Sequence, residues 1–336
     1  MKTYEIAEPK GIDSLKLVDR PTPKPKPTEV LIRVRATSLN YRDLVTVKGG
    51  AVTRGIRLPL VPLSDGAGDV VEVGSEVTRF KAGDRVVASF FQNWIAGSPR
   101  SSYFRSALGG AIDGTLAEYM TLSEEGLVPI PDYMTFEEAA TLPCAAVTSW
   151  NALVSMGRIT AGETVLVLGT GGVSIFALQF ARMHGARVIA TSSSDSKLSR
   201  LRELGASGVI NYKKTPEWDT QVLEMTGGDG VDHVIEVGGS GTLTRSIRAV
   251  KLGGRISLIG LLAGGGQIDP MPMLLKSITL QGIFVGSREM FDEMNRAMAV
   301  NNIHPMIDRV FPFSQARDAY SYLESGAHFG KVCIAV

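Results

Sequence analysis

Cysteine is scarce in this chain: Cys144 and Cys333 are the only two among 336 residues. They lie far apart in the sequence, so we expect no disulfide framework, and a reducing compartment fits this usage. The chain also lacks an excess of charge, since its formal net charge is +1. A nearly neutral protein gives no reason to expect nucleic acid or an anionic membrane surface as a partner.

Long hydrophobic runs are missing as well. No uninterrupted apolar segment reaches membrane-spanning length, and the N-terminal residues Met1–Ile6 lack the charged and then apolar pattern of a signal peptide. We therefore expect a cytoplasmic protein with no membrane partner. Hydrophobic residues make up 44% of the chain, which is enough for a large core, and its length favours two domains.

The most informative segment is Thr164–Ser174, where an apolar strand runs directly into a glycine-rich turn. A helix is predicted to follow over Ile175–His184. A strand, a glycine turn and a helix in this order build a site for a pyrophosphate, because the free N–H groups and the dipole of the helix N-terminus hold negative charge. Ser174 stands where the pattern Gly-x-Gly-x-x-Gly has its third glycine.

The glycines of this turn have different predicted tasks. Gly169 allows the tight turn, Gly171 lets the backbone approach the phosphates, and Gly172 keeps side chains out of the way. The predicted cofactor contacts in the turn are Gly169, Thr170, Gly171, Gly172 and Val173.

Strand and helix patterns alternate after this turn. This alternation predicts an α/β fold, with a doubly wound parallel sheet covered on both faces and a ligand at the carboxyl ends of its strands. Val237, which ends the fourth strand, and Gly238, which follows it, are therefore further predicted cofactor contacts. The predicted strands are Thr164–Leu168, Ala186–Thr191, Val209–Tyr212, Val231–Val237, Arg255–Ile259 and Ile278–Ile283, and the predicted helices between them include Asp195–Leu204, Trp218–Met225 and Leu243–Lys251.

The first part of the chain reads as a β-rich domain with proline and glycine turns. Its predicted strands are Lys2–Ile6, Leu15–Val18, Glu29–Ala36, Gly68–Val73 and Arg85–Phe90. The helix Gln315–Leu323 and the strand Lys331–Ala335 look like a return to this domain. We therefore predict a β-rich domain over residues 1–125 and 288–336 and a dinucleotide-binding domain over residues 126–287.

Several sequence motifs, spread over essentially the whole chain, resemble those of a known enzyme family. Besides the Gly169 turn, they are Leu39–Asp43, Pro59–Gly68, Gly83–Val86, Ala139–Ala146, Lys197–Ala206 and His328–Val332. With these motifs the chain resembles the medium-chain dehydrogenase/reductases, and among them most closely the zinc-free alcohol dehydrogenase-like and quinone oxidoreductase-like enzymes. The resemblance implies a GroES-like β-rich catalytic domain followed by a Rossmann domain.

The resemblance also shows a departure from the zinc-dependent branch. The three positions that hold the catalytic zinc there correspond to Asn40, Ser64 and Cys144 here, which leaves one thiol where three protein ligands are needed. The segment Phe91–Gly114, which corresponds to the structural zinc lobe, contains no cysteine. We therefore expect no metal, and we expect Cys144 to be a packed residue.

The choice of cofactor depends on the end of the second Rossmann strand. NAD-specific relatives carry an acidic residue there, whereas this chain has Ser192, which we also predict to be a cofactor contact. In quinone oxidoreductase-like relatives the contacts to the 2′-phosphate correspond to Ser193, Lys197 and Tyr212, so the resemblance favours NADP(H). The alternative is that the serines cap the following helix and Lys197 is a solvated surface residue.

The catalytic groups are harder to place. Hydride transfer to a carbonyl or an enone leaves negative charge on an oxygen, which needs a hydrogen-bond donor when no metal is present. Asn40 and Tyr41 are the candidates, and the alternative for both is bracing of their loop. By resemblance, Thr148 packs beside the nicotinamide. Phe90–Trp94 and the segment after it could form an aromatic wall and a lid, although such aromatics are more often core.

Together these features predict a zinc-independent, NADPH-dependent oxidoreductase acting on a small enone, quinone or aldehyde. The alternatives are a zinc-free alcohol dehydrogenase working oxidatively and a non-catalytic NADPH-binding regulatory protein. The strand near Ser277–Val285 is apolar and close to the end of the sheet. Because an apolar sheet edge needs cover, we expect a homodimer.

Overall fold

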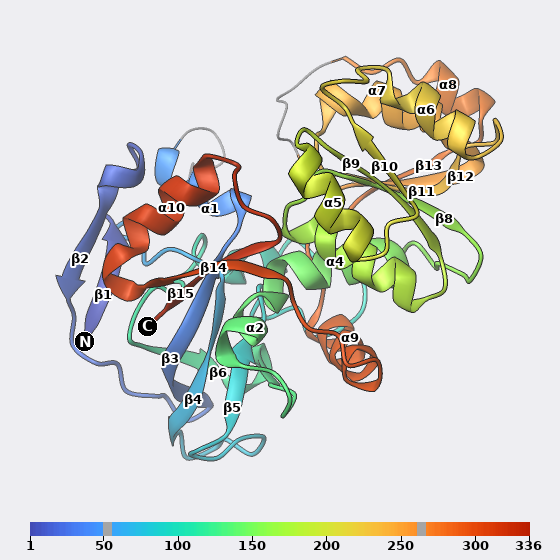
Figure 1. Cartoon of the computed structure of the whole chain (residues 1–336). Helices are drawn as coiled ribbons and strands as arrows, with labels where there is room; N and C mark the ends of the chain where they lie inside the picture. The colour runs from blue at the N-terminus through green and yellow to red at the C-terminus, as the bar shows by residue number, and fades with distance from the viewer. Residues whose placement is uncertain (50–55, 261–266) are drawn as a thin grey trace. The chain divides into compact units, whose positions relative to one another are not determined.

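The computed structural model describes residues 1–49, 56–260 and 267–336. The chain divides into two compact units, Met1–Val147 with Val285–Val336, and Thr148–Phe284 (Figure 1). The first unit extends beyond the predicted boundary at residue 125, because α2 (Phe136–Ala140) packs against two strands of its sheet, β3 and β4. The α/β fold class, with a β-rich domain and a parallel-sheet domain, is confirmed.

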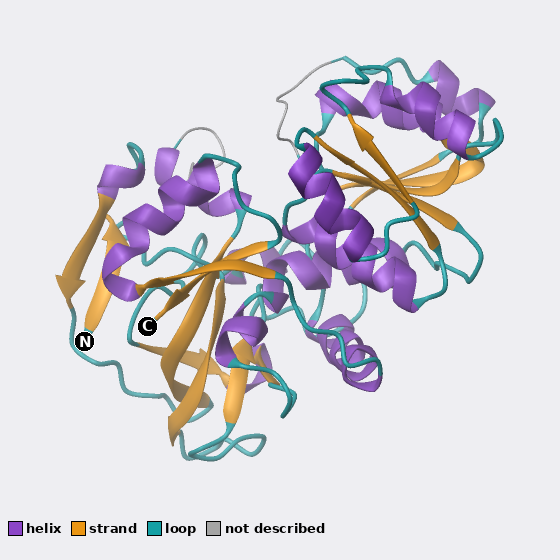
Figure 2. Cartoon of the chain, viewed as in Figure 1, coloured by secondary structure: helices purple, strands orange, loops and turns teal. Residues whose placement is uncertain are grey.

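The second unit is built on a six-stranded sheet in the order β10-β9-β8-β11-β12-β13, and every neighbouring pair is parallel. Figure 2 shows helices in purple on both faces of this sheet. The strands are β8 (Thr164–Leu168), β9 (Arg187–Ser192), β10 (Gly208–Asn211), β11 (Val231–Glu236), β12 (Val250–Leu258) and β13 (Thr279–Gly282). The helices are α4 (Gly172–Met183), α5 (Asp195–Glu203), α6 (Trp218–Met225), α7 (Ser240–Ala249) and α8 (Met271–Leu275).

The strand order reverses between β8 and β11. The chain winds outward from β8 through β9 to β10 in one direction, and from β11 through β12 to β13 in the other. Ligands of doubly wound sheets bind at such a reversal, outside the carboxyl ends of the two central strands. The turn after β8 and the turn after β11 are therefore the expected cofactor positions.

The predicted strands of this unit are confirmed, with shifted ends. Two helices begin three residues earlier than predicted: α4 begins at Gly172 and not at Ile175, and α7 begins at Ser240 and not at Leu243. In α4, the amide of Ile175 already donates to the carbonyl of Gly171 at 3.0 Å. Part of the core lies where α6 and α7 cover the sheet: Leu166 of β8, Trp218 of α6 and Ile247 of α7 belong to one buried cluster.

The first unit contains a seven-stranded sheet in the order β14-β15-β3-β4-β5-β7, with β6 paired to β3, and a separate β1-β2 hairpin. Alternate residues of β3, Val30, Ile32 and Val34, are buried in one core cluster, as expected for a strand with an inward face. The strands are β1 (Lys2–Ile6), β2 (Leu15–Asp19), β3 (Glu29–Leu39), β4 (Asp65–Val73), β5 (Arg85–Ala88), β6 (Tyr119–Ser123), β7 (Leu127–Pro129), β14 (Ile307–Pro312) and β15 (Lys331–Ala335).

The predicted return of the C-terminal segment to this domain is confirmed. Strand β15 pairs antiparallel with β3, with Val332 opposite Leu39. The helices of this unit include α1 (Tyr41–Lys48), α9 (Arg288–Val300) and α10 (Ala316–Glu324), and α3 (Val147–Trp150) crosses the boundary between the units. Within the described ranges, none of the helices has the length and apolar character that crossing a membrane requires.

Candidate active site

The glycine-rich turn after β8 has an open approach. Gly169 has a φ of +77°, a conformation that L side chains rarely adopt. Gly171 has an ordinary φ of −76°, and a Cβ placed on either glycine meets no atom within 4 Å. Packing inside the protein therefore does not explain the missing side chain at Gly171, and the backbone there is open to the close approach of a ligand.

Ser174 explains how this turn works without a third glycine. Its buried hydroxyl donates to the carbonyl of Leu168 at 2.6 Å, which ties the first turn of α4 to the end of β8. On the other side, the amide of Gly169 donates to the hydroxyl of Thr191 at 3.3 Å. Both ends of the turn are thus braced by side chains, and Thr170 and Val173 lie in the braced segment.

Helix α4 presents its N-terminus at this turn. It is a 12-residue helix with Gly171 as its N-cap and Gly172 as its first residue. The N–H groups of a first helical turn have no partner within the helix, and the helix dipole places partial positive charge there. The turn can therefore hold a pyrophosphate through backbone N–H groups.

The predicted 2′-phosphate contacts lie at the ends of two adjacent strands and on the helix that follows. Ser192 ends β9 and is buried, and its carbonyl accepts from the amide of Tyr212 at 3.1 Å. Ser193 and Lys197, the latter on α5, are half-buried, and Tyr212 is 40% exposed. Hydroxyl, phenol and ammonium groups therefore belong to one end of the sheet.

Two further observations bear on this end of the sheet. Ser194 is the N-cap of α5, but its hydroxyl pairs with the hydroxyl of Ser196 at 2.8 Å and makes no capping bond to the backbone. Asp195 is the acidic residue nearest to the serines in sequence. Its carboxylate is paired with Lys214 at 2.6 Å and with Asn211 at 2.7 Å, and these bonds, that of Lys214 first, lower its pKa.

The turn after β11 is held by a buried carboxylate. Glu236 accepts hydrogen bonds from the amides of Gly238 at 2.8 Å and Gly239 at 3.0 Å, and from the hydroxyl of Thr242 at 2.5 Å. Glu236 is therefore occupied by the protein itself. Of the two predicted contacts at the carboxyl end of β11, Glu236 engages the amide of Gly238 and leaves Val237 and the carbonyl of Gly238.

Thr148 is buried next to the start of α4. Its neighbour Ser149 donates a hydrogen bond to the carbonyl of Val173 at 2.8 Å. Both residues lie in α3, between two π-helical turns, Leu142–Ala146 and Asn151–Ser155. Interruptions of this kind are frequent at functional sites.

In the first unit, Asn40 lies between the end of β3 and the start of α1. It is the N-cap of α1, and its backbone N–H donates to the Asp43 carboxylate at 2.8 Å. The side-chain oxygen of Asn40 accepts from the ammonium of Lys331 at 2.6 Å, whereas its side-chain nitrogen Nδ2 is buried without a hydrogen-bond partner. Asn40 thus carries an unused N–H donor.

Asp43 is the second carboxylate of this region. It is fully buried, and burial raises its pKa from 3.8 to about 6, although the nearby Arg42 guanidinium, 3.4 Å away, opposes the shift. Its neighbour in sequence, Tyr41, is 51% exposed on the first turn of α1. The two predicted oxyanion donors therefore differ: Asn40 belongs to a buried polar cluster, and Tyr41 faces solvent.

The side chains at the three positions equivalent to zinc ligands form a poor donor set for zinc. Asn40 uses its oxygen on an ammonium, and Ser64 donates its hydroxyl to Asp65 at 2.6 Å. Cys144 is therefore the one side chain of the usual nitrogen and sulfur ligand types among the three. Across residues 1–49, 56–260 and 267–336, no three His, Cys, Asp or Glu side chains form a group able to hold a metal ion.

Comparisons with known proteins agree with this architecture. Residues 26–132 match the family described as alcohol dehydrogenase GroES-like domain, and residues 172–300 match the family described as zinc-binding dehydrogenase. The chain is 47% identical over 334 residues to the zinc-type alcohol dehydrogenase-like protein C1773.06c of Schizosaccharomyces pombe, covering 97% of this chain and 96% of that protein. The chain belongs to the medium-chain dehydrogenase/reductase superfamily.

Two other members of the superfamily widen the range of activities among its relatives. The NADPH-dependent alkenal/one oxidoreductase, chloroplastic, of Arabidopsis thaliana is 32% identical, and the match covers 99% of this chain and 79% of that protein. A crystal structure described as an NAD-dependent alcohol dehydrogenase superposes with a TM-score of 0.91 at 32% identity, covering 100% of both chains. Oxidoreductase activity is therefore what the named relatives share.

The aromatic segment of this medium-chain dehydrogenase/reductase is packed within the first unit. Phe90, Phe91 and Trp94 are buried, and the indole N–H of Trp94 donates to the carbonyl of Gly97 at 2.9 Å. Tyr103 stacks on Trp94 with ring centroids 6.0 Å apart. These rings form one connected cluster, as in a hydrophobic core.

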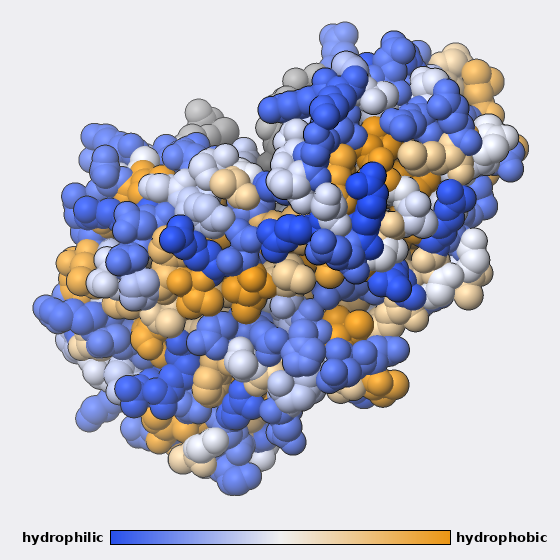
Figure 3. Space-filling model, viewed as in Figure 1, coloured by the Kyte–Doolittle hydropathy of each residue, from blue (hydrophilic) through white to orange (hydrophobic). Residues whose placement is uncertain are grey.

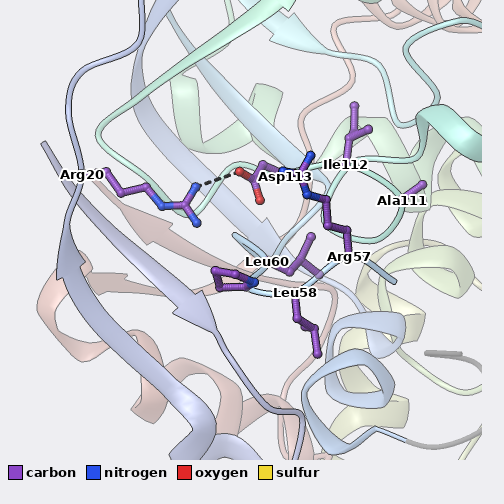
Figure 4. A pocket seen from close by; sticks show the side chains of 8 residues that line it. Arg20, Arg57, Leu58, Leu60, Ala111, Ile112 and Asp113 are labelled. Atoms are coloured by element: carbon purple, nitrogen blue, oxygen red, sulfur yellow. Dashed lines mark hydrogen bonds and ion pairs between the residues drawn. The ribbon is translucent and has the colours of Figure 1, made fainter. Parts of the chain in front are cut away.

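A separate hollow of about 350 Å³ opens in the same unit and is lined by Arg20, residues 57–60 and residues 111–113 (Figure 4). Arg20 points at Asp113, with which it forms an ion pair at 2.8 Å, and it also pairs with Glu5. Its charge is therefore already neutralised. The hollow contains none of the predicted site residues of this medium-chain dehydrogenase/reductase.

Two members of the polar cluster were not predicted as site residues. Lys331 and Asp65 are both buried, and their side chains lie 3.5 Å apart. Each stands inside a motif of the superfamily, but neither motif indicates that an ammonium is buried beside Asn40. A local signal did exist for Asp43: the pair Asn40-x-x-Asp43 has the spacing of a capping box.

Proposed function

We propose that this protein is a zinc-independent, NADPH-dependent reductase of small enones, quinones or aldehydes. The observation that carries this proposal is the Asn40 side chain, which stands at a position equivalent to a zinc ligand, is bonded through its oxygen to an ammonium, and keeps a buried, unused N–H donor. Such a donor suits an oxygen that gains negative charge during hydride transfer.

The second unit supports the cofactor part of the proposal. The open glycine turn and the N-terminus of α4 would hold the pyrophosphate, and Val237, Gly238 and Thr148 would border the nicotinamide half. Ser193, Lys197 and Tyr212 would hold the 2′-phosphate, and the negative charge of Asp195 near them is paired with Lys214. When bound, the dihydronicotinamide supplies a hydride.

The substrate chemistry follows from the donor. The hydride would add to the carbonyl carbon of an aldehyde or to the β-carbon of an enone, and the displaced electron pair would move to the oxygen. Asn40 would stabilise that oxygen by donating a hydrogen bond, and a proton from water would complete the reduction. The name of the Arabidopsis relative, an NADPH-dependent alkenal/one oxidoreductase, agrees with this class of substrate.

The proposed zinc independence rests on the side chains at the three positions equivalent to zinc ligands. It does so although one matching family and the Schizosaccharomyces pombe relative carry zinc in their names. An amide oxygen bonded to an ammonium and a hydroxyl bonded to a carboxylate do not replace the nitrogen and sulfur ligands of a catalytic zinc site. We therefore assign the task of a Lewis acid to hydrogen bonding by Asn40.

We further propose a homodimer formed through β13. This strand ends the sheet and, within the described part of the chain, pairs only with β12. Exposed apolar side chains lie on this strand and on the helix that precedes it in the chain, namely Leu280 of β13 and Leu274 and Leu275 of α8. Figure 3 shows orange, apolar side chains at the end of the unit where Figure 1 labels α8 and β13. Both cysteines are free, which fits our proposal of a cytoplasmic location.

The test is consumption of NADPH by the purified protein with a panel of enones, quinones and aldehydes. We expect turnover on at least one class, and Asn40→Asp, which replaces the N–H donor with an oxygen, should lower the turnover number roughly a hundredfold. Tyr41→Phe, which removes an exposed hydroxyl, should leave turnover within about twofold. No NADPH consumption on any substrate, combined with tight NADPH binding, would favour a regulatory protein.

A further inference from the structure

Lys331 is the most deeply buried cation of the candidate site, and the predictions from sequence assign it no task. It is the first residue of β15 and is only 2% exposed. Its ammonium donates to the carbonyl of Leu39 at 2.8 Å and to the side-chain oxygen of Asn40 at 2.6 Å, and lies 3.5 Å from the Asp65 carboxylate. Three acceptors surround an ammonium that has three N–H donors.

The neighbouring strands hold this arrangement in place. Strands β15, β3 and β4 are consecutive in the sheet, and they carry Lys331, Leu39 and Asp65 at the same edge. Asp65 is itself fixed, because it accepts from the hydroxyl of Ser64 at 2.6 Å. Because Lys331 is only 2% exposed and its ammonium is engaged with Leu39, Asn40 and Asp65, any role in the reaction acts through another residue.

That residue is Asn40. An asparagine side-chain amide can rotate by half a turn, which exchanges the positions of its oxygen and nitrogen, unless its hydrogen-bond partners favour one orientation. An ammonium has only donors, so the atom 2.6 Å from Lys331 must be the oxygen. The opposite orientation would place the amide N–H groups against a positive charge and lose a charge-assisted hydrogen bond.

The orientation of the oxygen determines where the nitrogen lies. Nδ2 of Asn40 is the atom left buried and without a partner, while the residue as a whole is half-buried. A cation on the amide oxygen also polarises the amide and makes its N–H groups stronger donors, as in other linked hydrogen bonds.

We propose that Lys331 is a positioning residue, whose ammonium holds the Asn40 amide by its oxygen so that the amide nitrogen is presented to the oxygen of the substrate. This inference rests on the reductase function proposed above. It assigns to a buried ammonium the task of orienting the group that replaces a metal ion.

The experiment compares three variants of the full-length protein. Lys331→Met combined with Asp65→Asn removes the ammonium without leaving a buried carboxylate unpaired. Lys276→Met is the matched control, because Lys276 is another lysine whose ammonium is held by the protein, donating to the carbonyls of Ile247, Arg248 and Val250. Lys331→Gln, which keeps a donor for Asp65, replaces the double variant if the latter does not fold.

Two readouts are measured. In kinetics, the Lys331 variant should lose roughly tenfold to a hundredfold in turnover number while its dissociation constant for NADPH stays within about twofold, and the control should match the parent. In ¹⁵N–¹H spectra of protein labelled at asparagine, the side-chain resonances of Asn40, assigned by their disappearance in Asn40→Asp, should shift in the Lys331 variant and stay in place in the control.

The results separate this inference from the proposed function. A folded Lys331 variant that keeps its turnover number within about twofold, or leaves the Asn40 side-chain resonances unmoved, overturns the inference while the reductase function stands. A parent protein that reduces no substrate overturns the reductase function, and the spectra then still decide whether Lys331 orients Asn40.

Discussion

The open space at Gly171 gives a prediction that separates cofactor binding from folding. Gly171 precedes α4 with φ −76° and ψ 177°, angles that alanine also adopts. A Cβ added there meets no atom of the protein within 4 Å. Gly171→Ala therefore places a methyl group only in the space where we expect the pyrophosphate.

The effect of Gly171→Ala on stability should be small. Alanine is a poorer N-cap than glycine by several tenths of a kcal/mol, but it also restricts the unfolded chain, which stabilises the protein by about 0.4–1 kcal/mol. These effects oppose each other, so we expect a change within about 0.5 kcal/mol. In binding, loss of one charge-assisted hydrogen bond to phosphate costs about 1.5–3 kcal/mol, which is roughly tenfold or more in affinity for NADPH.

The assay is calorimetric titration with NADPH, together with denaturant unfolding of the same samples. Gly282→Ala is the matched control, because Gly282 lies in β13 and a Cβ there also meets nothing within 4 Å. Gly169→Ala is the opposite case, since its φ of +77° strains any side chain, so both stability and affinity should fall. A Gly171→Ala protein that binds NADPH as tightly as the parent would refute the assignment of this turn.

Three further predictions concern cofactor choice, pH and assembly. Lys197→Ala should weaken NADPH binding roughly tenfold or more and leave NADH binding unchanged; equal losses for both cofactors in titrations would contradict a 2′-phosphate contact. In the folded protein the pKa of Asp43 is raised from 3.8 to about 6, so its carboxyl group holds a proton more tightly than in the unfolded chain. The protein should therefore lose up to about 3 kcal/mol of stability as the pH rises from about 4 to about 6. Asp43→Asn should remove this loss, and unfolding experiments that find the same pH dependence in both proteins would exclude it. Leu280→Lys places like charges across the proposed β13 interface and should give the 36.0 kDa mass of one chain in light scattering, whereas an unchanged dimer would rule out this edge.

The sequence was sufficient for the elements whose pattern is local. The apolar strand Thr164–Leu168 and the glycine turn after it were predicted because period, length and turn chemistry all point to the same structure. The start of α4 was misplaced by three residues, because glycines have low helix propensity and gave no helical signal before Ile175.

The polar cluster of the first unit could be predicted only in part. Asn40 was predicted from the loop that it shares with the superfamily. Lys331, which contacts Asn40, and Asp65, which contacts Lys331, come from two other strands of the sheet. No local sequence pattern predicts that two charged side chains far apart in the sequence will be buried next to each other. The exposure of Tyr41 likewise depends on how α1 lies on the sheet, which the sequence of the helix does not reveal.

The most direct test of the account is the turnover number of the protein after exhaustive chelation, with zinc determined by elemental analysis on the same sample. We predict that NADPH-dependent reduction of an enone or quinone continues at the parent rate with no stoichiometric zinc, because Asn40 and Ser64 are occupied by Lys331 and Asp65. One tightly held zinc per chain, with activity lost on its removal and restored on its return, would contradict the account.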